Sequence, residues 1–215
     1  MLCQQGVEEA RRGRPPEARR LAARARAIVE ELGMPMYVAG SAMQHDQIES
    51  LAGDPAARER VLRESYQQLV AIGERGMLSN IAADLADALV DLGRIDEAEA
   101  VCAVAAEAGA KDDVHTQVDV RLVRGRIAAA RGSLDDALAS AAAGFAIADQ
   151  TELYNLLTSS RLVVAQLLLD AGHFDEARAC AQEVIDLARV RGDIVTEGRA
   201  RNLVERTEVT SPAAN

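Results

Sequence analysis

Histidine, cysteine and paired carboxylates are the residue types that most often hold metals or transfer protons, and this chain spreads them widely. The histidines are His45, His115 and His173, and none has a cysteine or carboxylate at metal-ligand spacing. A phosphate-binding loop of the type Gly-x-x-x-x-Gly-Lys-Ser/Thr does not occur. The sequence therefore predicts a protein that is not an enzyme and has no catalytic residues, metal site or cofactor.

The cysteines, Cys3, Cys102 and Cys180, are odd in number and lack Cys-x-x-Cys spacing, which fits a reducing compartment. Paired acids recur three residues after a glycine, at Asp96-Glu97, Asp135-Asp136 and Asp175-Glu176. The helix dipole favours acidic side chains in the first turn of a helix. We therefore interpret these pairs as helix starts and not as acid–base machinery. Cys102 lies nine residues after its glycine, in register with the small residues Ala22, Ala141 and Ala181, and is expected in the core.

These glycines belong to a repeat that runs through the whole chain. Its members are spaced by 40, 40, 39 and 40 residues, along the series Gly13, Gly53, Gly93, Gly132 and Gly172. A fixed period in this range is typical of stacked helical pairs. Alanine supplies much of the 49% apolar content, aromatic residues are only 2%, and residues 56–211 contain no proline. The sequence therefore predicts an all-α protein.

Each repeat is interpreted as two helices joined at its glycine, which can adopt the left-handed conformation that a helix end often requires. Asp54 is expected to be an N-cap with Pro55 at the first helical position, and Ser133 is a second candidate cap. The expected helices are 1–12, 15–32, 36–52, 55–74, 77–92, 95–109, 114–131, 134–149, 153–171, 174–191 and 194–207.

We expect one repeat domain over residues 1–207, followed by a disordered tail at 208–215. A last helix with a polar outer face suits the end of such an array. Met1 falls inside the first helix of the first unit, so either the chain is cut from something longer or that helix is short. The expected units are 1–34, 35–75, 76–112, 113–151 and 152–192, with a capping helix at 193–207.

The net charge of −10 disfavours binding to nucleic acid or to anionic membranes. No apolar run approaches the roughly 20 residues that span a bilayer, and no signal peptide is read at the N-terminus. We therefore expect a cytoplasmic protein without nucleic-acid or membrane partners. The stretch 11–26 is an exception in charge, with seven arginines against Glu17. It is either a solvated helix face or a docking patch for another domain or an acidic partner.

The repeat resembles the tetratricopeptide repeat (TPR). That family has a glycine, a large apolar residue two positions later and an alanine five positions later, as in Gly93/Ile95/Ala98, Gly132/Leu134/Ala137 and Gly172/Phe174/Ala177. Seven positions before the glycine it has a small residue, here Gly6, Ala86, Gly125 and Ala165. The second unit departs, with Asp46 at that position and Ala57 displaced by one. The period of about 40 also exceeds the usual 34. The resemblance implies a right-handed α-α superhelix, a TPR-like solenoid of about five helix-turn-helix units with a C-terminal capping helix.

Units three to five carry a narrower resemblance. Residues 93–100, 112–114 and 124–132 look like the C-terminal repeat region of large bacterial signalling proteins that have an AAA-type ATPase domain. Those proteins also carry a nucleotide cyclase domain or a LuxR-type DNA-binding domain, and the motifs of these domains are absent here. Lys111 is the only lysine, which is compatible with a GC-rich bacterial genome. The resemblance implies a regulatory region of a larger signalling protein or transcription regulator.

In the TPR family the first helices of successive units line a concave, peptide-binding face. Asn80 and Asp87 flank Ala83, where a clamp for carboxylates would need lysine, so that mode is not expected. A mixture of polar and aliphatic side chains suits an extended or helical peptide, although each residue could also belong to a merely solvated face. The candidates are Met43, Gln47, Asn80, Asp87, Asp119, Leu122, Arg126, Leu162 and Gln166.

Three functions stay open at the level of sequence. The first is a regulatory module that binds a protein or peptide partner, or neighbouring domains of a larger polypeptide. The second is a stand-alone adaptor that associates with itself. The third is a sensor for a small-molecule effector, which requires a defined pocket between units. Fold alone does not choose among them, and the sequence does not specify the oligomeric state.

Overall fold

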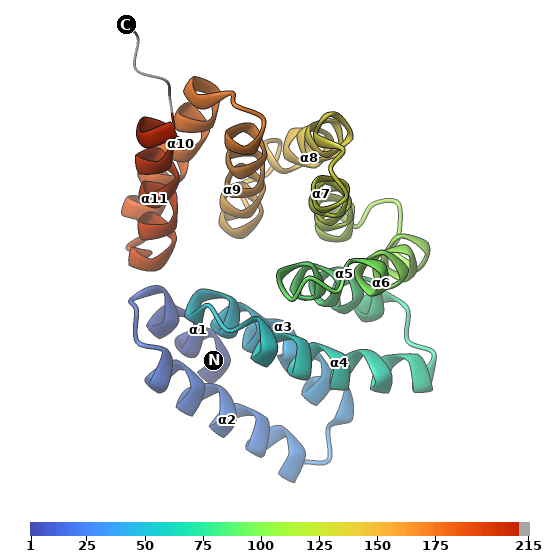
Figure 1. The fold of residues 1–215 in the computed structure, drawn as a ribbon. Helices are drawn as coiled ribbons and strands as arrows, with labels where there is room; N and C mark the ends of the chain where they lie inside the picture. The colour runs from blue at the N-terminus through green and yellow to red at the C-terminus, as the bar shows by residue number, and fades with distance from the viewer. Residues whose placement is uncertain (211–215) are drawn as a thin grey trace, which may run out of the picture. The chain divides into compact units, whose positions relative to one another are not determined.

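The computed structural model describes residues 1–210, which form eleven α-helices and no strand (Figure 1). The all-α class and the helix-turn-helix repeats are confirmed. The chain divides into two compact units, Met1–Thr116 and Gln117–Asn215, and each is described by itself. Among the described residues, no helix combines the length and the apolar character that crossing a bilayer requires.

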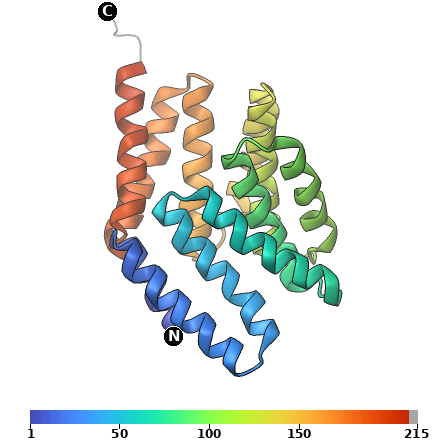
Figure 2. The same ribbon diagram turned by 60° about the horizontal axis from the view of Figure 1, so that its bottom comes forward.

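Unit 1 consists of three helical hairpins. Within it α3 contacts both α1 and α5, so the first helices of successive repeats form one layer. Figure 2 shows α2, α3 and α4, coloured from blue to teal, side by side. The hairpins are α1 (Leu2–Arg11) with α2 (Pro15–Glu31), α3 (Pro35–Ala52) with α4 (Pro55–Ile72), and α5 (Gly76–Asp91) with α6 (Ile95–Ala108).

Helix α7 (Val114–Ala130) begins at the end of unit 1 and continues into unit 2. In unit 2, α9 contacts α8, α10 and α11, and α10 contacts α11. The last helix therefore packs against the final hairpin, as a capping helix does. The remaining helices are α8 (Leu134–Ala148), α9 (Tyr154–Asp170), α10 (Phe174–Arg191) and α11 (Ile194–Thr210).

Glycines with positive φ end most of the helices that precede a tight turn. At Gly93 φ is 71°, its N–H donates to the carbonyl of Val90, and the N–H of Arg94 donates to Leu89, both at 2.9 Å. This pair of bonds closes a helix end that only a left-handed residue allows. The other members are the four expected glycines of the repeat and three that the sequence analysis did not assign, Gly33, Gly73 and Gly192.

One of the two predicted N-caps, Asp54, is confirmed. Asp54 accepts a hydrogen bond from the N–H of Ala57 at 2.9 Å, with Pro55 in the first turn. Ser133 makes no such bond, because its hydroxyl donates to the carboxylate of Asp136 at 2.6 Å. The expected role of Cys102 as a small core residue is confirmed, since it is 2% exposed.

The last helix extends three residues beyond the expected boundary at 207, so residues 208–210 are helical and not part of a disordered tail. Thr207 is fully buried, and its hydroxyl accepts a hydrogen bond from Arg178 on α10 at 3.2 Å. This anchor holds the last turn, and the sequence has no glycine or proline between Thr207 and Pro212 to end the helix earlier. The rest of the predicted tail, 211–215, lies outside the described residues.

Candidate binding surface

The two helices of a repeat approach closely at the small residues seven positions before and five positions after the turn glycine. A Cβ added at Gly6 would lie 3.0 Å from the carbonyl oxygen of Ala18. At Gly125 it would lie 2.9 Å from the carbonyl oxygen of Ala137. Such distances leave no room for a side chain, so these glycines set how near the helices come.

The second repeat replaces this pair of small residues by an ion pair. Asp46 and Arg58 occupy the two positions, and the Nε of Arg58 donates to Asp46 Oδ1 at 2.7 Å. Both residues are 6% exposed. The two departures of this repeat from the TPR pattern are therefore one structural feature, in which each residue compensates for the charge of the other.

Arg58 also joins the second repeat to the third. Its Nη1 donates to Asp91 at 2.9 Å and to Asp87 at 3.1 Å, and both acceptors lie on α5. Burial alone would lower the pKa of Arg58, but the charges of Asp46 and Asp87 outweigh it and hold that pKa well above its usual value. Burial raises the pKa of Asp46 more than Arg58 lowers it. The guanidinium thus holds three carboxylates on one side of unit 1.

The candidate residues of unit 1 share the layer formed by α3 and α5. Met43, Gln47, Asn80 and Asp87 are all half-buried. Asp87 is paired with Arg58, as described above. The amide nitrogen of Asn80 donates to the carboxylate of Asp113 at 3.4 Å. Met43 and Gln47 lie on α3, which is joined to α5 by the bonds of Arg58 to Asp46 and Asp87.

The candidates of unit 2 are less uniform. Leu122 is only 4% exposed, so its side chain is not available to a partner. It packs where Gly144 of α8 has no side chain, since its Cδ2 lies 3.3 Å from the position of an added Cβ. Asp119 and Arg126 on the same helix, α7, are half-buried. Arg126 and Leu122 are four residues apart, yet only Leu122 faces the core.

Two further candidates lie on α9. Leu162 packs against the buried clusters that α9 forms with α10 and α11, so it supports the core more than it faces solvent. Gln166 accepts a hydrogen bond from Arg206 of α11 at 2.7 Å and donates one to Asp170 at 2.6 Å. The last helix therefore covers part of the face on which these two residues were expected.

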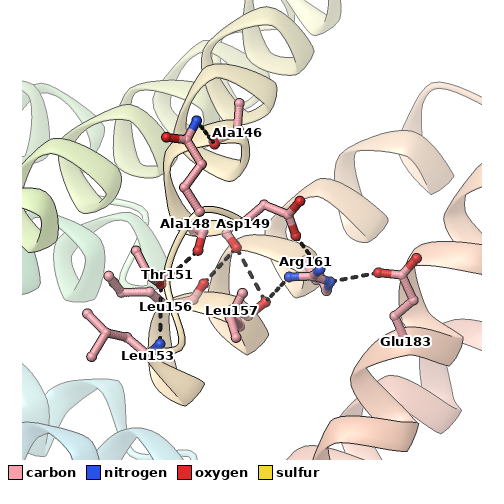
Figure 3. Close-up of polar contacts among 11 residues, drawn as sticks. Ala146, Ala148, Asp149, Thr151, Leu153, Leu156, Leu157, Arg161 and Glu183 are labelled. Atoms are coloured by element: carbon pink, nitrogen blue, oxygen red, sulfur yellow. Dashed lines mark hydrogen bonds and ion pairs between the residues drawn. The ribbon is translucent and has the colours of Figure 1, made fainter.

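A buried arginine also organises unit 2. Arg161, 8% exposed, donates to Asp149 at 2.7 Å, to Glu183 at 2.8 Å and to the carbonyl of Leu157 at 3.2 Å (Figure 3). Its guanidinium also lies 4.9 Å from the ring centroid of Phe145. Burial opposes the charge of Arg161, but the bonds to Glu183 and Asp149 outweigh it and raise its pKa. It links α9 to α8 and α10.

The basic stretch 11–26 is largely neutralised within the protein. Arg19 of α2 donates to Glu49 of α3 at 2.5–3.0 Å, and Arg26 of α2 donates to Glu64 of α4 at 2.5–3.1 Å. Arg11, Arg12, Arg14 and Arg20 also pair with nearby carboxylates. These contacts favour the interpretation as a solvated, ion-paired helix face.

Histidine and cysteine side chains are common metal ligands, so their surroundings in the structure bear on whether a metal site could form. Within residues 1–210 no group of three or more His, Cys, Asp or Glu side chains could hold a metal ion. His45 donates from Nδ1 to the carbonyl of Ser41 at 2.8 Å, when that nitrogen carries the proton, and His173 lies 3.1 Å from Glu176. All three cysteines are free thiols.

Three segments match the family model of the tetratricopeptide repeat, at residues 5–24, 81–103 and 159–183. In these segments, which make up less than half of the chain, the sequence is similar to tetratricopeptide repeats. Each matched segment runs from a first helix across its turn glycine into the second helix, as α1–α2, α5–α6 and α9–α10 do. The second TPR-like unit, with Asp46 and Arg58 at its crossing, lies outside the matched segments. No curated protein matches the chain. TPRs generally mediate protein–protein interactions, and their all-helical fold is typically non-catalytic.

Sequence reasoning missed the caps of α7 and α11, which are a half-buried aspartate, Asp113, and a buried one, Asp193. Asp113 accepts from Thr116 Oγ1 at 2.6 Å, and Asp193 accepts from Thr196 Oγ1 at 2.9 Å. Each aspartate precedes a first helix, with a threonine three residues later. An Asp-x-x-Thr sequence at the same phase of the repeat is a signal that could have revealed both.

Proposed function

We propose that this chain is a non-catalytic interaction module that binds a peptide or protein segment along the first helices of its repeats. The supporting observation is the layer of α3 and α5 in unit 1, where Met43 and Gln47 are half-buried on α3 and Arg58 joins Asp46 of α3 to Asp87 of α5. The TPRs in the chain support the general role. The proposal extends to Asp119 and Arg126 on the corresponding helix of unit 2.

The chemistry of this layer suits a peptide more than a reactive substrate. A methionine adapts its shape to different apolar anchors, and a glutamine amide can both donate to and accept from a peptide backbone. The ordered carboxylates beside them favour a segment that carries a basic residue. We expect the contribution of each contact to be modest and the specificity to come from their combination.

Selection from a displayed peptide library, with the whole chain as bait, tests this proposal. We expect an enriched peptide sequence that binds at about micromolar affinity in calorimetry. Met43→Ala with Gln47→Ala should weaken that peptide about tenfold or more, because both anchors are lost. Gln67→Ala, an exposed change on α4, is the matched control and should bind as the unaltered chain does. Equal affinity of the double variant would rule out this surface.

We propose further that the module is a cytoplasmic regulatory region of a multidomain bacterial signalling protein or transcription regulator. The support is the narrower resemblance of units three to five and the near-exclusive use of arginine. The DNA upstream of the codon for Met1 tests it. We expect an open frame that encodes an ATPase or cyclase segment, and a stop codon in frame with no such segment would contradict the proposal.

A further inference from the structure

Charge is distributed unevenly among the helices of unit 1. The first helices α3 and α5 contain no lysine or arginine, whereas the second helices α2 and α4 contain seven arginines. The acidic residues of α3 and α5 are Asp46, Glu49, Asp84, Asp87 and Asp91. A surface that these two helices form together therefore attracts a positively charged segment more than a negatively charged one.

One face of α5 changes from apolar to acidic along its length. Its members follow one another at intervals of three or four residues, the spacing that places side chains on one face of a helix. They are Met77, Asn80, Asp84, Asp87 and Asp91, and all are half-buried or exposed. Because a helix rises by about 1.5 Å per residue, Asp84 lies about 10 Å and Asp87 about 15 Å beyond Met77 along the helix axis.

The apolar end of this face adjoins α3. A Cβ added at Gly40 would lie 3.3 Å from the Cε of Met77, so the thioether rests against the backbone of α3 at this glycine. Met36 precedes Gly40 by four residues and Met43 follows it by three, so both flank this contact on the same face of α3. Three thioethers therefore gather at one end of the two helices. Their flexible side chains can adapt to a bulky apolar anchor of a partner.

Arg58 holds the acidic end in place from inside the protein. Its side chain is 7% exposed, whereas the side chains of Asp87 and Asp91, to which it donates, are 30% and 33% exposed. These carboxylates therefore reach solvent while a buried guanidinium fixes their orientation. A side chain that is already ordered loses little conformational entropy when a cation of a partner binds it from outside.

The two helices favour a partner segment that is itself helical. The backbone of a helix is hydrogen-bonded within the helix, so α3 and α5 offer an extended segment only side-chain partners for its amides. The amide nitrogen of Asn80 is one such group, and it already donates to Asp113 at 3.4 Å. A helical segment satisfies its own backbone and needs only side-chain contacts with the surface.

We propose that the partner of this surface is an amphipathic helix that carries one large apolar residue and, two and three turns along the same face, arginine or lysine. This inference rests on the proposed function and adds the chemistry and spacing of the partner. Positions seven and eleven residues from the anchor share its face and lie about 10 Å and about 16 Å from it. These separations match those of Asp84 and Asp87 from Met77 when the partner lies along α5.

Two synthetic peptides of equal composition test the spacing by fluorescence anisotropy with the whole chain. Both are helices of alanine and glutamine with phenylalanine at the fourth position. The first has arginines at its eleventh and fifteenth positions, and the second has them at its ninth and thirteenth, on the opposite face. We expect about micromolar affinity for the first peptide and at least about tenfold weaker binding of the second. Equal binding of the two peptides would overturn the proposal.

A neutral substitution on α5 tests the contact with the arginines. Asp84→Asn should weaken the first peptide about fivefold and leave unchanged a version with glutamines in place of its arginines, because the lost contact needs both partners. Glu107→Gln is the matched control, since it removes a carboxylate from an exposed position of α6. It should leave the affinity of both peptides unchanged. An equal loss with Glu107→Gln would indicate a response to net charge alone and would contradict docking on this face.

The display selection described above separates a failure of this inference from a failure of the proposed function. Selected peptides that depend on Met43 and Gln47 but carry no basic residue at these spacings would support the proposed function and overturn this inference. Selected peptides that ignore the double variant at Met43 and Gln47 would overturn both. We expect dependence on both residues together with an apolar anchor and basic residues seven and eleven positions away.

Discussion

Replacing Arg58 with methionine is expected to lower the free energy of unfolding by about 3–5 kcal/mol. Methionine preserves most of the volume of the side chain but removes the guanidinium. Asp46, whose side chain is 9% exposed, would then either keep a buried charge without its partner or take up a proton, because burial already raises its pKa. Asp87 and Asp91 would suffer less, because their side chains are 30% and 33% exposed and can be hydrated. Urea denaturation followed by circular dichroism measures the change.

The double variant Asp46→Val with Arg58→Met separates the cost of an orphaned charge from the value of the ion pair. Apolar side chains of similar volume commonly replace a buried ion pair at little cost or with a gain in stability. We therefore expect the double variant to lie within about 1 kcal/mol of the unaltered chain. A double variant as unstable as Arg58→Met alone would show that the pair itself stabilises the crossing, against this argument.

Two controls fix the scale of this experiment. Arg161→Met removes a guanidinium that is equally buried, but its partners Asp149 and Glu183 are 52% and 60% exposed. Their carboxylates can return to water, so we expect a smaller loss than for Arg58→Met. Arg20→Met breaks an exposed pair with Glu17 and should leave the stability unchanged within error. The burial of the carboxylate partners, and not the number of ion pairs, therefore sets the expected order of the losses in stability.

The helices could be predicted closely because local residues specify their ends. Gly53, Asp54 and Pro55 act within a few residues of one another, so their effect is visible in sequence. The turns at Gly33, Gly73 and Gly192 were not assigned, although two of them lie midway between repeat glycines. These glycines end the second helices of repeats, whereas the TPR pattern describes the turn that ends the first helix. A search at half the period would have found Gly33 and Gly73.

Positions on a face could be counted from the sequence, but burial could not. Leu122 has the same phase as Leu162 and Ala83, yet its environment depends on Gly144 of another helix, which leaves space for it. Gln166 is covered by Arg206 from forty residues away. Asp46 and Arg58 were each visible as departures from the pattern, and only their distance of 2.7 Å shows that they compensate.

Replacing Asp193 with alanine is the second large effect that we expect, a loss of about 2–4 kcal/mol. Its carboxylate is 2% exposed and accepts from the N–H and the hydroxyl of Thr196, both at 2.9 Å, and from the hydroxyl of Tyr154 at 3.0 Å. Alanine would remove the cap of α11 and leave the two buried donors of Thr196 and the half-buried hydroxyl of Tyr154 without this acceptor. Because α11 packs on α9 and α10, the loss should reach the whole end of unit 2.

The matched control is Asp54→Ala, since Asp54 caps α4 through one N–H bond with a side chain that is 41% exposed. Its removal should cost about 1 kcal/mol. Asp193→Asn keeps an oxygen for the Thr196 N–H and should cost less than Asp193→Ala. Urea denaturation gives the free energies, and hydrogen exchange should show lost protection in α11 for Asp193→Ala. If Asp193→Ala costs no more than Asp54→Ala, then burial adds nothing to this cap. The contact between Tyr154 and Asp193 would then not hold the last helix in place.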